Sequence, residues 1–199
     1  MKKIEITLNY STIEKLISLI DKPNQSICLK ILQDNRLLFE TARGSTHNHQ
    51  TWDGGYIDHI TDGMNLVPYL FHMLHSIRPL PFSMSDALLV FFIHDLEKPW
   101  RILIKGGKAF NKEGISTKSE FAAFRNQKLI EYGLVLTPEQ ENAFKYIEGE
   151  YKDYSSTHRV SNELAAFCHM VDTWCARGWY DYPKAENDEW EGAGRVRTK

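Results

Sequence analysis

Residues 91–100 read FFIHDLEKPW, a stretch in which an apolar run ends in a histidine and an aspartate side by side. The run begins near residue 84 and is apolar on every face, which favours a helix over residues 84–95 at the centre of the protein. A continuous buried strand is the alternative interpretation. Because an unpaired polar group is costly to bury, His94 and Asp95 need partners from elsewhere in the chain.

Two further predicted helices offer such partners. A helix over residues 56–77 carries His59 near its start, beside the main apolar stripe. Asp172 lies within the last predicted helix, on a strip that is otherwise small and apolar, so its carboxylate is expected to face inward. The helices would then bring together two imidazoles and two carboxylates, namely His59, His94, Asp95 and Asp172. This set suits a divalent transition metal with coordination sites left for water.

The order of these residues resembles the HD-domain superfamily of metal-dependent phosphohydrolases. The pattern of that superfamily is a histidine, then a His-Asp doublet, then a distant aspartate, each on a helix, and the resemblance covers residues 45–178. The chain is most similar to members that read HHxxPGGLxEH and then HDxxK, in which the matching positions are His49, Gly54, Gly55, His59, His94, Asp95 and Lys98. The resemblance implies an all-α, single-domain helical bundle with short strands or extended loops as minor elements.

The resemblance also implies hydrolysis of a phosphate ester or anhydride, in a nucleotide or a short oligonucleotide. The expected ion is Mn, Fe, Co, Ni or Zn, which would activate water and neutralise phosphate charge. Asp95 would serve as ligand and general base, and Lys98 would hold a phosphate oxygen or the leaving group. His49 would contact the phosphate or protonate the leaving oxygen. Arg177 and the aromatic residues around it would bind substrate, unless they only cover the core.

Two departures from the family pattern affect these expectations. Between Asp95 and Lys98 the chain has Leu96 and Glu97, whose charge would pair with Lys98 or reshape the loop. Members with two metal ions have further histidines before the final aspartate, where this chain has His158, and glutamates stand where a histidine is expected. One ion is therefore the default, and a second ion held by Glu148 or Glu150 is left open.

Other interpretations of the same residues remain. The scaffold also carries di-iron oxygenases, which need more histidine ligands than this chain offers, and non-catalytic regulatory domains. His47, His72 and His75 are expected not to be ligands, and His169 is expected to pack or to support Asp172. The glycine turn between Lys105 and Lys108 is expected to be solvated, with anion binding as the alternative.

Composition narrows the class of protein. The chain has 199 residues and a net charge of -2, which argues against extensive binding to duplex nucleic acid or to an anionic membrane. Its three cysteines lack the spacing of a disulfide framework or a thiolate zinc site. No signal peptide or membrane-spanning run is expected, so we expect a cytoplasmic enzyme with a small-molecule phosphate substrate. Self-association is left open.

The remaining segments are expected to be mostly helical within one domain. We divide it into an N-terminal helical part (1–44), the phosphohydrolase core (45–183) and a loose tail (184–199). A weak strand over 1–10 would precede a helix capped by Ser11 and Glu14. Further helices are expected over the segments 25–43, 116–133 and 137–150, with a short strand or extended loop over 100–111. The second of these helices is expected to end near Gly133, and the third to begin with the capping pair Thr137 and Gln140.

Overall fold

The computed structural model describes residues 10–105, 108–110 and 114–182, and the protein in these ranges is mainly helical. The elements are α1 (Ile13–Ile17), α2 (Asn24–Asp34), α3 (Arg36–Thr41), α4 (Gly55–Ile77), α5 (Met84–Ile93), α6 (Lys98–Arg101), β1 (Leu103–Lys105), β2 (Lys108–Phe110), α7 (Lys118–Tyr132), α8 (Pro138–Tyr146), the 3-10 turn Tyr151–Asp153, α9 (Glu163–Thr173) and the π-helical turn Trp174–Gly178. The all-α class is therefore confirmed, and the strands form one small antiparallel hairpin.

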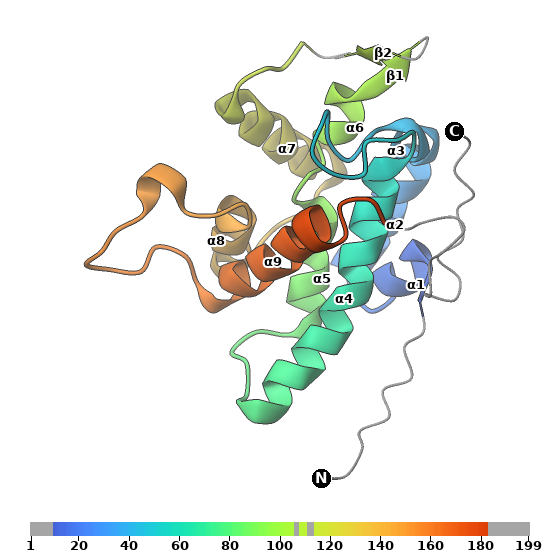
Figure 1. The fold of residues 1–199 in the computed structure, drawn as a ribbon. Helices are drawn as coiled ribbons and strands as arrows, with labels where there is room; N and C mark the ends of the chain where they lie inside the picture. Colours follow the sequence, from blue (N-terminus) through green and yellow to red (C-terminus); the bar gives the residue numbers. More distant parts are fainter. Residues whose placement is uncertain (1–9, 106–107, 111–113, 183–199) are drawn as a thin grey trace.

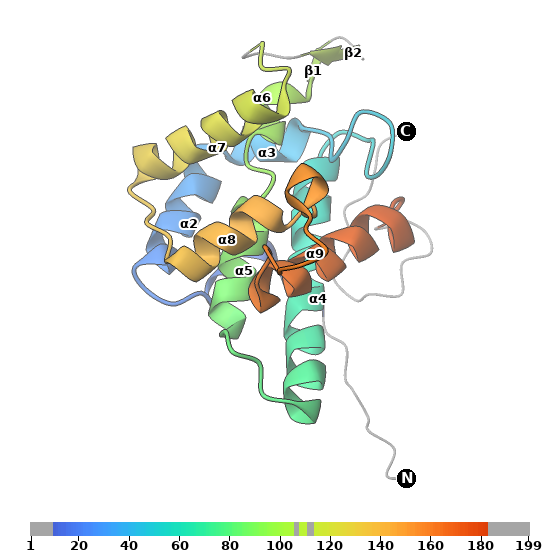
Figure 2. The ribbon, with the colours of Figure 1, turned by 90° about the vertical axis from the view of Figure 1, so that its left-hand side faces the viewer.

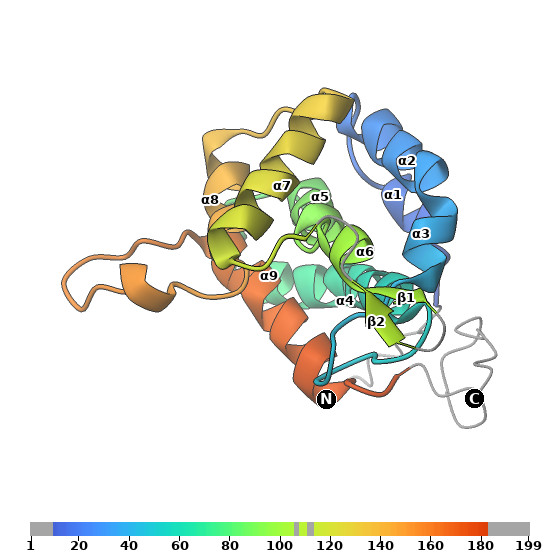
Figure 3. The ribbon, with the colours of Figure 1, turned by 90° about the horizontal axis from the view of Figure 1, so that it is seen from above.

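Helix α5 lies at the centre of the molecule, and the other helices surround it (Figure 3). Its N-terminus is closed by a reciprocal pair in which the Ser83 side chain accepts from the backbone of Asp86 and the Asp86 side chain accepts from the backbone of Ser83. Every residue from Ala87 to Ile93 is buried. The prediction of a central buried helix is confirmed, and the strand alternative is wrong. The helix ends at Ile93, so the His-Asp doublet occupies the turn that follows.

Helix α4 is the long helix on which α5 packs (Figure 1). Its N-terminal half is buried and its C-terminal end extends beyond the other helices, as Figures 1 and 2 show. Pro68 lies within it without ending it. The two helices approach closely at Gly63, because a Cβ built on that residue would stand 2.0 Å from Cζ of Phe91. The absence of a side chain at Gly63 therefore sets the spacing between α4 and α5.

Helices α8 and α9 pack against each other, and both contact α5 (Figure 2). The connection between α8 and α9 projects from the body of the molecule (Figures 1 and 3). Helix α8 begins with the predicted capping pair Thr137 and Gln140, and α7 begins with a similar pair and ends at Gly133, whose φ is 68°. The predicted start of α8 and the predicted end of α7 are confirmed, whereas the helix predicted over 137–150 ends earlier, at Tyr146. None of the described helices is long and apolar enough to cross a membrane.

One prediction about the N-terminal part is confirmed and another is wrong. The segment 25–43 is mainly helical, as predicted, but it is divided into α2 and α3 at Asn35, whose side-chain amide donates to the carbonyl of Ile31 at 2.8 Å and competes with the continuing helix. The first helix is capped by Thr12 instead of Ser11, and Glu14 forms an ion pair with Arg36. Most of the predicted strand over 1–10 and the tail 184–199 lie outside the described residues.

Candidate metal centre

Four side chains from three parts of the chain meet in the core with their donor atoms facing one another. Nε2 of His59 lies 3.1 Å from Oδ1 of Asp172 and 3.6 Å from Oδ2 of Asp95. Nε2 of His94 lies 3.1 Å from Oδ2 of Asp95 and 3.5 Å from Oδ1 of Asp172. A metal bond of about 2.1 Å places neighbouring ligand atoms about 3.0–3.4 Å apart in octahedral or tetrahedral coordination. The two spacings of 3.1 Å lie within this range and those of 3.5 and 3.6 Å lie just above it, so the four side chains are arranged nearly as ligands of one ion would be.

The donor atoms lack the hydrogen bonds that buried polar atoms normally make. Nε2 of His59 and Nε2 of His94 are buried without a hydrogen-bond partner in good geometry among the described residues, and Oδ2 of Asp95, also buried without such a hydrogen bond, has an ion pair with Lys98. Leaving such atoms unsatisfied is costly, and a cation would satisfy all three. A group of His59, His94 and Asp172 is accordingly able to hold a metal ion, since their donor atoms all lie within 4.8 Å of one another.

The orientation of His94 is set by the helix that carries it. Its Nδ1 donates to the carbonyl oxygen of Phe91, 2.7 Å away, so Nε2 is the nitrogen that faces the carboxylates. Histidine ligands commonly donate their second nitrogen to a carbonyl or carboxylate in this way, which fixes both the tautomer and the ring. The end of α5 thus directs Nε2 of His94 toward the carboxylates of Asp95 and Asp172.

Charge in the centre is balanced among the same groups. Burial opposes a charge on His94, but Asp95 and Asp172 outweigh it and raise its pKa to about 10. Burial has the larger effect on His59, whose pKa is lowered although Asp172 opposes the shift. Burial also opposes the charge on Asp172, yet the two imidazoles hold its pKa well below the ordinary range. A proton on His94 therefore offsets part of the negative charge of the two carboxylates.

Lys98 lies directly beside this centre. Its ammonium group forms an ion pair with Oδ2 of Asp95, one turn earlier in the chain. Burial opposes the charge on Lys98, but Asp95 raises its pKa above the ordinary value, so the lysine is cationic at neutral pH. The Lys98 side chain is 12% exposed, so the cation meets the open side of the site. The expectation that Lys98 stands next to the His-Asp doublet agrees with this position.

Glu97 does not pair with Lys98, which was one of the two expectations for this residue. Its carboxylate is buried and accepts from Nη1 of Arg125 at 3.2 Å, and Nη2 of Arg101 lies 3.7 Å away. Leu96 beside it is fully buried. The two residues that depart from the family pattern therefore face α7 and the core instead of the metal centre. The separation in sequence hid this pairing, because Arg125 lies 28 residues from Glu97.

His49 lies near the centre, with its ring tilted by 47° against that of His59 and the two ring centroids 4.8 Å apart. Its orientation depends on Gln50, whose amide nitrogen lies 2.8 Å from the Trp179 carbonyl oxygen, 3.3 Å from that of Cys175 and 3.4 Å from that of Tyr182. Because carbonyls only accept, the amide oxygen of Gln50 must face Nδ1 of His49, 2.6 Å away. Nδ1 is therefore the protonated nitrogen, and Nε2 of His49 is an acceptor.

Burial lowers the pKa of His49 to about 3, and the neighbouring His59 and Lys98 act in the same direction. The ring is therefore neutral at physiological pH, with its single proton engaged by Gln50. This arrangement favours His49 as a hydrogen-bond acceptor over the expected role of proton donor. Nothing in the sequence pattern singled out Gln50, because its partners come from the distant end of α9.

Gly54 and Gly55 allow the loop that carries His49 to pack closely on the start of helix α4. Gly54 precedes α4 in the left-handed conformation, with φ at 80°. Gly55 lies so close to the loop that a Cβ on it would stand 1.8 Å from the carbonyl oxygen of Gln50. The two glycines thus allow the loop that carries His49 to lie against the first turn of α4, next to the turn that carries His59.

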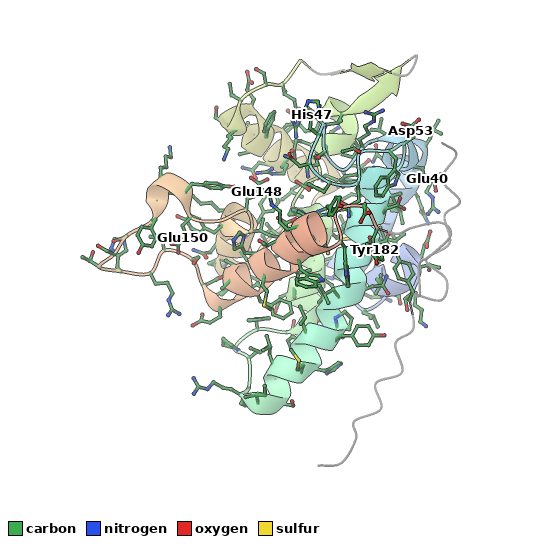
Figure 4. All side chains as sticks on the ribbon, viewed as in Figure 1. Glu40, His47, Asp53, Glu148, Glu150 and Tyr182 are labelled. Atoms are coloured by element: carbon green, nitrogen blue, oxygen red, sulfur yellow. The ribbon has the colours of Figure 1, made fainter. Side chains whose placement is uncertain are left out.

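An open cleft of about 350 Å³ leads to the centre. Its polar walls include Asp95, Lys98, Asp172, His49, Arg177, Asn48, Glu148 and His169. Arg177 therefore lies where a substrate-binding cation was expected, whereas Trp174, Trp179 and Tyr180 do not line the cleft. Of the two glutamates considered for a second ion, Glu148 reaches the cleft and Glu150 accepts from the backbone and hydroxyl of Ser161 instead (Figure 4).

The remaining histidines lie apart from the ligand atoms. His47 is exposed on the loop before α4 (Figure 4), and His72 and His75 are exposed near the end of α4. His158 contacts Ser155 on the projecting connection. His169 lines the cleft and donates from Nδ1 to the Ile147 carbonyl oxygen at 2.6 Å. The glycines between Lys105 and Lys108 lie outside the described residues. All three cysteines are buried and free, as expected.

The comparisons with known proteins identify no relative. No protein-family model, curated protein or solved structure matches the chain. The chemical interpretation of the centre therefore depends on the residues and their geometry.

Proposed function

We propose that the chain is a metal-dependent phosphohydrolase of the HD-domain type, which cleaves a phosphate ester or anhydride in a nucleotide or short oligonucleotide. One observation supports this proposal above the others: unsatisfied donor atoms converge at the base of a polar cleft, with a lysine cation at the same carboxylate. Such a combination provides a place for a divalent ion and for the anionic oxygens of a phosphate.

The proposed ligands are the four residues His59, His94, Asp95 and Asp172. An ion held there, either Mn, Fe, Co, Ni or Zn, would lower the pKa of water and neutralise charge on phosphate oxygens. We propose one ion, since Glu150 is engaged by Ser161. Glu148 is the additional carboxylate on the cleft wall that a second ion would need.

The other residues of the cleft have distinct proposed roles. Lys98 and Arg177 would stabilise the charge that develops on the phosphate oxygens. Asp95 would orient the attacking water, because the charges of His94 and Lys98 outweigh its burial and hold its pKa well below the usual range. His49 would accept a hydrogen bond from the nucleophile through Nε2. This role requires a free lone pair on Nε2 of His49, in agreement with the engagement of its Nδ1 proton by Gln50.

The decisive experiment is a screen for phosphate release from nucleotides, cyclic nucleotides and short oligonucleotides with each metal. Elemental analysis of protein purified without added metal should accompany the screen. Lys98→Met should lower turnover by about 10²–10³ while the metal content stays unchanged. Lys30→Met is the matched control, because Lys30 pairs with Asp34 on the exposed face of α2 and should leave turnover unchanged.

Anaerobic assays separate this proposal from its rivals. Phosphate release that continues without oxygen and decreases in Lys98→Met supports a hydrolase. Strict dependence on oxygen, with an iron absorption band, would instead identify an oxygenase. A metal-loaded protein that turns over none of these compounds would indicate a binding domain without catalytic activity.

A further inference from the structure

The cleft over the metal centre adjoins a second cleft of about 370 Å³. The two share Tyr151 and His169 as walls, so the space beside Lys98 and Asp172 continues past these residues. The second cleft differs in character, since it is lined by Tyr146, Tyr151 and Tyr154 and exposes more apolar than polar surface. A ligand with a charged end and an aromatic end would match the polar first cleft and the tyrosine-lined second cleft.

Tyr151 is held in an unusual conformation at the boundary. Its φ is 45°, in the left-handed region that a bulky side chain rarely adopts, and its side chain is nevertheless exposed, at 61%. Such strain persists where the surroundings hold a residue in place, and it concentrates at ligand sites. The Lys118 ammonium lies over the Tyr151 ring, 3.7 Å from its centroid, and Lys118 lines neither cleft. The lysine thus supports the ring from outside the clefts.

His169 adds a polar contact of fixed direction. Because Nδ1 donates to the Ile147 carbonyl oxygen at 2.6 Å, Nε2 is the ring nitrogen that is left for a ligand. His169 lies one turn before Asp172 on α9, which places this nitrogen within reach of a molecule anchored at the metal centre. An aromatic ring that carries an N–H or amino group would pair with this nitrogen.

We infer that Tyr151 and His169 form a subsite for the base of a nucleotide whose phosphate lies at Lys98 and Arg177. The inference rests on the proposed function and deepens it by naming the residues that would hold the base of the substrate. Tyr151 would stack on the base, and Nε2 of His169 would accept from its N–H or amino group. The aromatic residues near the end of α9, expected earlier to serve this purpose, do not reach either cleft.

The test compares adenosine 5′-monophosphate with ribose 5-phosphate, which has the same sugar and phosphate but no base. Binding is measured by calorimetry on protein treated with a chelator, so that turnover does not interfere. Stacking of a base on an aromatic side chain corresponds to about 5- to 150-fold in affinity, and the nucleotide should bind tighter by that factor. Tyr151→Ala should remove this advantage and leave ribose 5-phosphate binding unchanged, whereas Tyr151→Phe should retain it.

The matched control is Trp174→Ala, which removes an exposed aromatic side chain that lines neither cleft. It should preserve the preference for the nucleotide. His169→Ala should weaken binding of adenosine 5′-monophosphate more than binding of purine riboside 5′-monophosphate, which lacks the amino group.

The subsite and the proposed function fail in different ways. A base preference that depends on Tyr151, in a protein that releases no phosphate, would support the subsite and contradict the hydrolase. Equal affinities for the two compounds would overturn the subsite, and so would loss of the preference in Trp174→Ala instead of Tyr151→Ala. Absence of nucleotide binding at millimolar concentration would also overturn it.

Discussion

The ring of Phe91 lies against the backbone of Gly63, where a Cβ would stand 2.0 Å from Cζ and 2.1 Å from Cε1. This contact joins the helix of His59 to the helix that precedes His94. Gly63 is one turn after His59, and Phe91 provides the carbonyl that orients His94. The spacing of the two helices and the geometry of the proposed ligands therefore depend on the same pair of residues.

Gly63→Ala is expected to disturb both stability and metal binding. The added methyl group must displace the Phe91 ring, and overpacking of this kind costs about 1–3 kcal/mol of unfolding free energy. Because Phe91 also positions His94, metal affinity should fall as well. Chemical denaturation and metal titration measure the two effects.

Gly133→Ala is the matched control for this substitution. Gly133 has a φ of 68° and open space around its Cβ position, so the cost of about 1 kcal/mol comes from backbone strain alone. Its metal affinity should equal that of the unmodified protein. A stable Gly63→Ala protein with unchanged metal affinity would show that the contact does not set the site.

Asp172→Ala should remove one proposed ligand and leave the other three in place. Loss of an outer contact to a metal ligand commonly weakens binding about 10–100-fold, and loss of a ligand should exceed this. Competition with a chelating dye measures the affinity, and elemental analysis after dialysis measures the content. His72→Ala is the control, since His72 is exposed on the far part of α4. Equal metal content in both variants would rule out Asp172 as a ligand.

Metal binding at pH 7 should release about one proton. In the metal-free protein Asp95 and Asp172 outweigh burial and raise the pKa of His94 to about 10, so its Nε2 is protonated at neutral pH. Nε2 must lose this proton to bind a metal, and the apparent affinity should therefore increase about tenfold per pH unit below pH 10. Calorimetry in buffers of different ionisation enthalpy counts the proton. A binding enthalpy independent of the buffer would contradict the role of His94.

Arg125→Met should destabilise the fold by leaving Glu97 buried without its closest cation. Removal of one partner from a buried pair costs about 3–5 kcal/mol. The Glu97→Gln/Arg125→Met double variant should recover much of the loss, because it buries no uncompensated charge. Arg159→Met is the control, since its pair with Glu163 is exposed and contributes less than about 1 kcal/mol.

The loss in Arg125→Met should also depend on pH. Burial and Asp95 already raise the pKa of Glu97 above its usual value of 4.5, and removal of the arginine should raise it further. The folded protein then binds this proton more tightly than the unfolded chain, so stability decreases as pH rises through the folded-state pKa. Arg125→Met should therefore be closest to the unmodified protein under acidic conditions. A loss that is the same at acidic and neutral pH would contradict an uncompensated carboxylate.

Several features of the fold follow from local patterns in the chain. The all-round apolar run predicted a central helix, and α5 is buried as expected. The capping residues Thr137 and Gln140 and the terminal Gly133 predicted helix boundaries that the structure confirms. Asn35 was missed, because its competition for the Ile31 carbonyl depends on one side-chain hydrogen bond that apolar periodicity does not reveal.

The candidate centre, like the fold, could be predicted only in part from the sequence. Residue types and helical placement were enough to select His59, His94, Asp95 and Asp172, because buried polar side chains on apolar helices need one another. Their order along the chain could not provide the distances between them, which depend on how closely Gly63 allows α5 to approach α4. Contacts between residues far apart in the chain could likewise not be predicted from the sequence.

Gln50 illustrates this limit, since its amide is oriented by carbonyls more than 120 residues away and in turn determines which nitrogen of His49 carries the proton. Tyr151 joins two clefts only because the connection between α8 and α9 returns beside His169. Helix formation and the apolar face that each helix buries leave a periodic pattern along the chain, so both can be inferred from that pattern. The partners of a charge, the tautomer of a histidine and the walls of a cleft depend on packing between distant segments, and they are established when the helices come together.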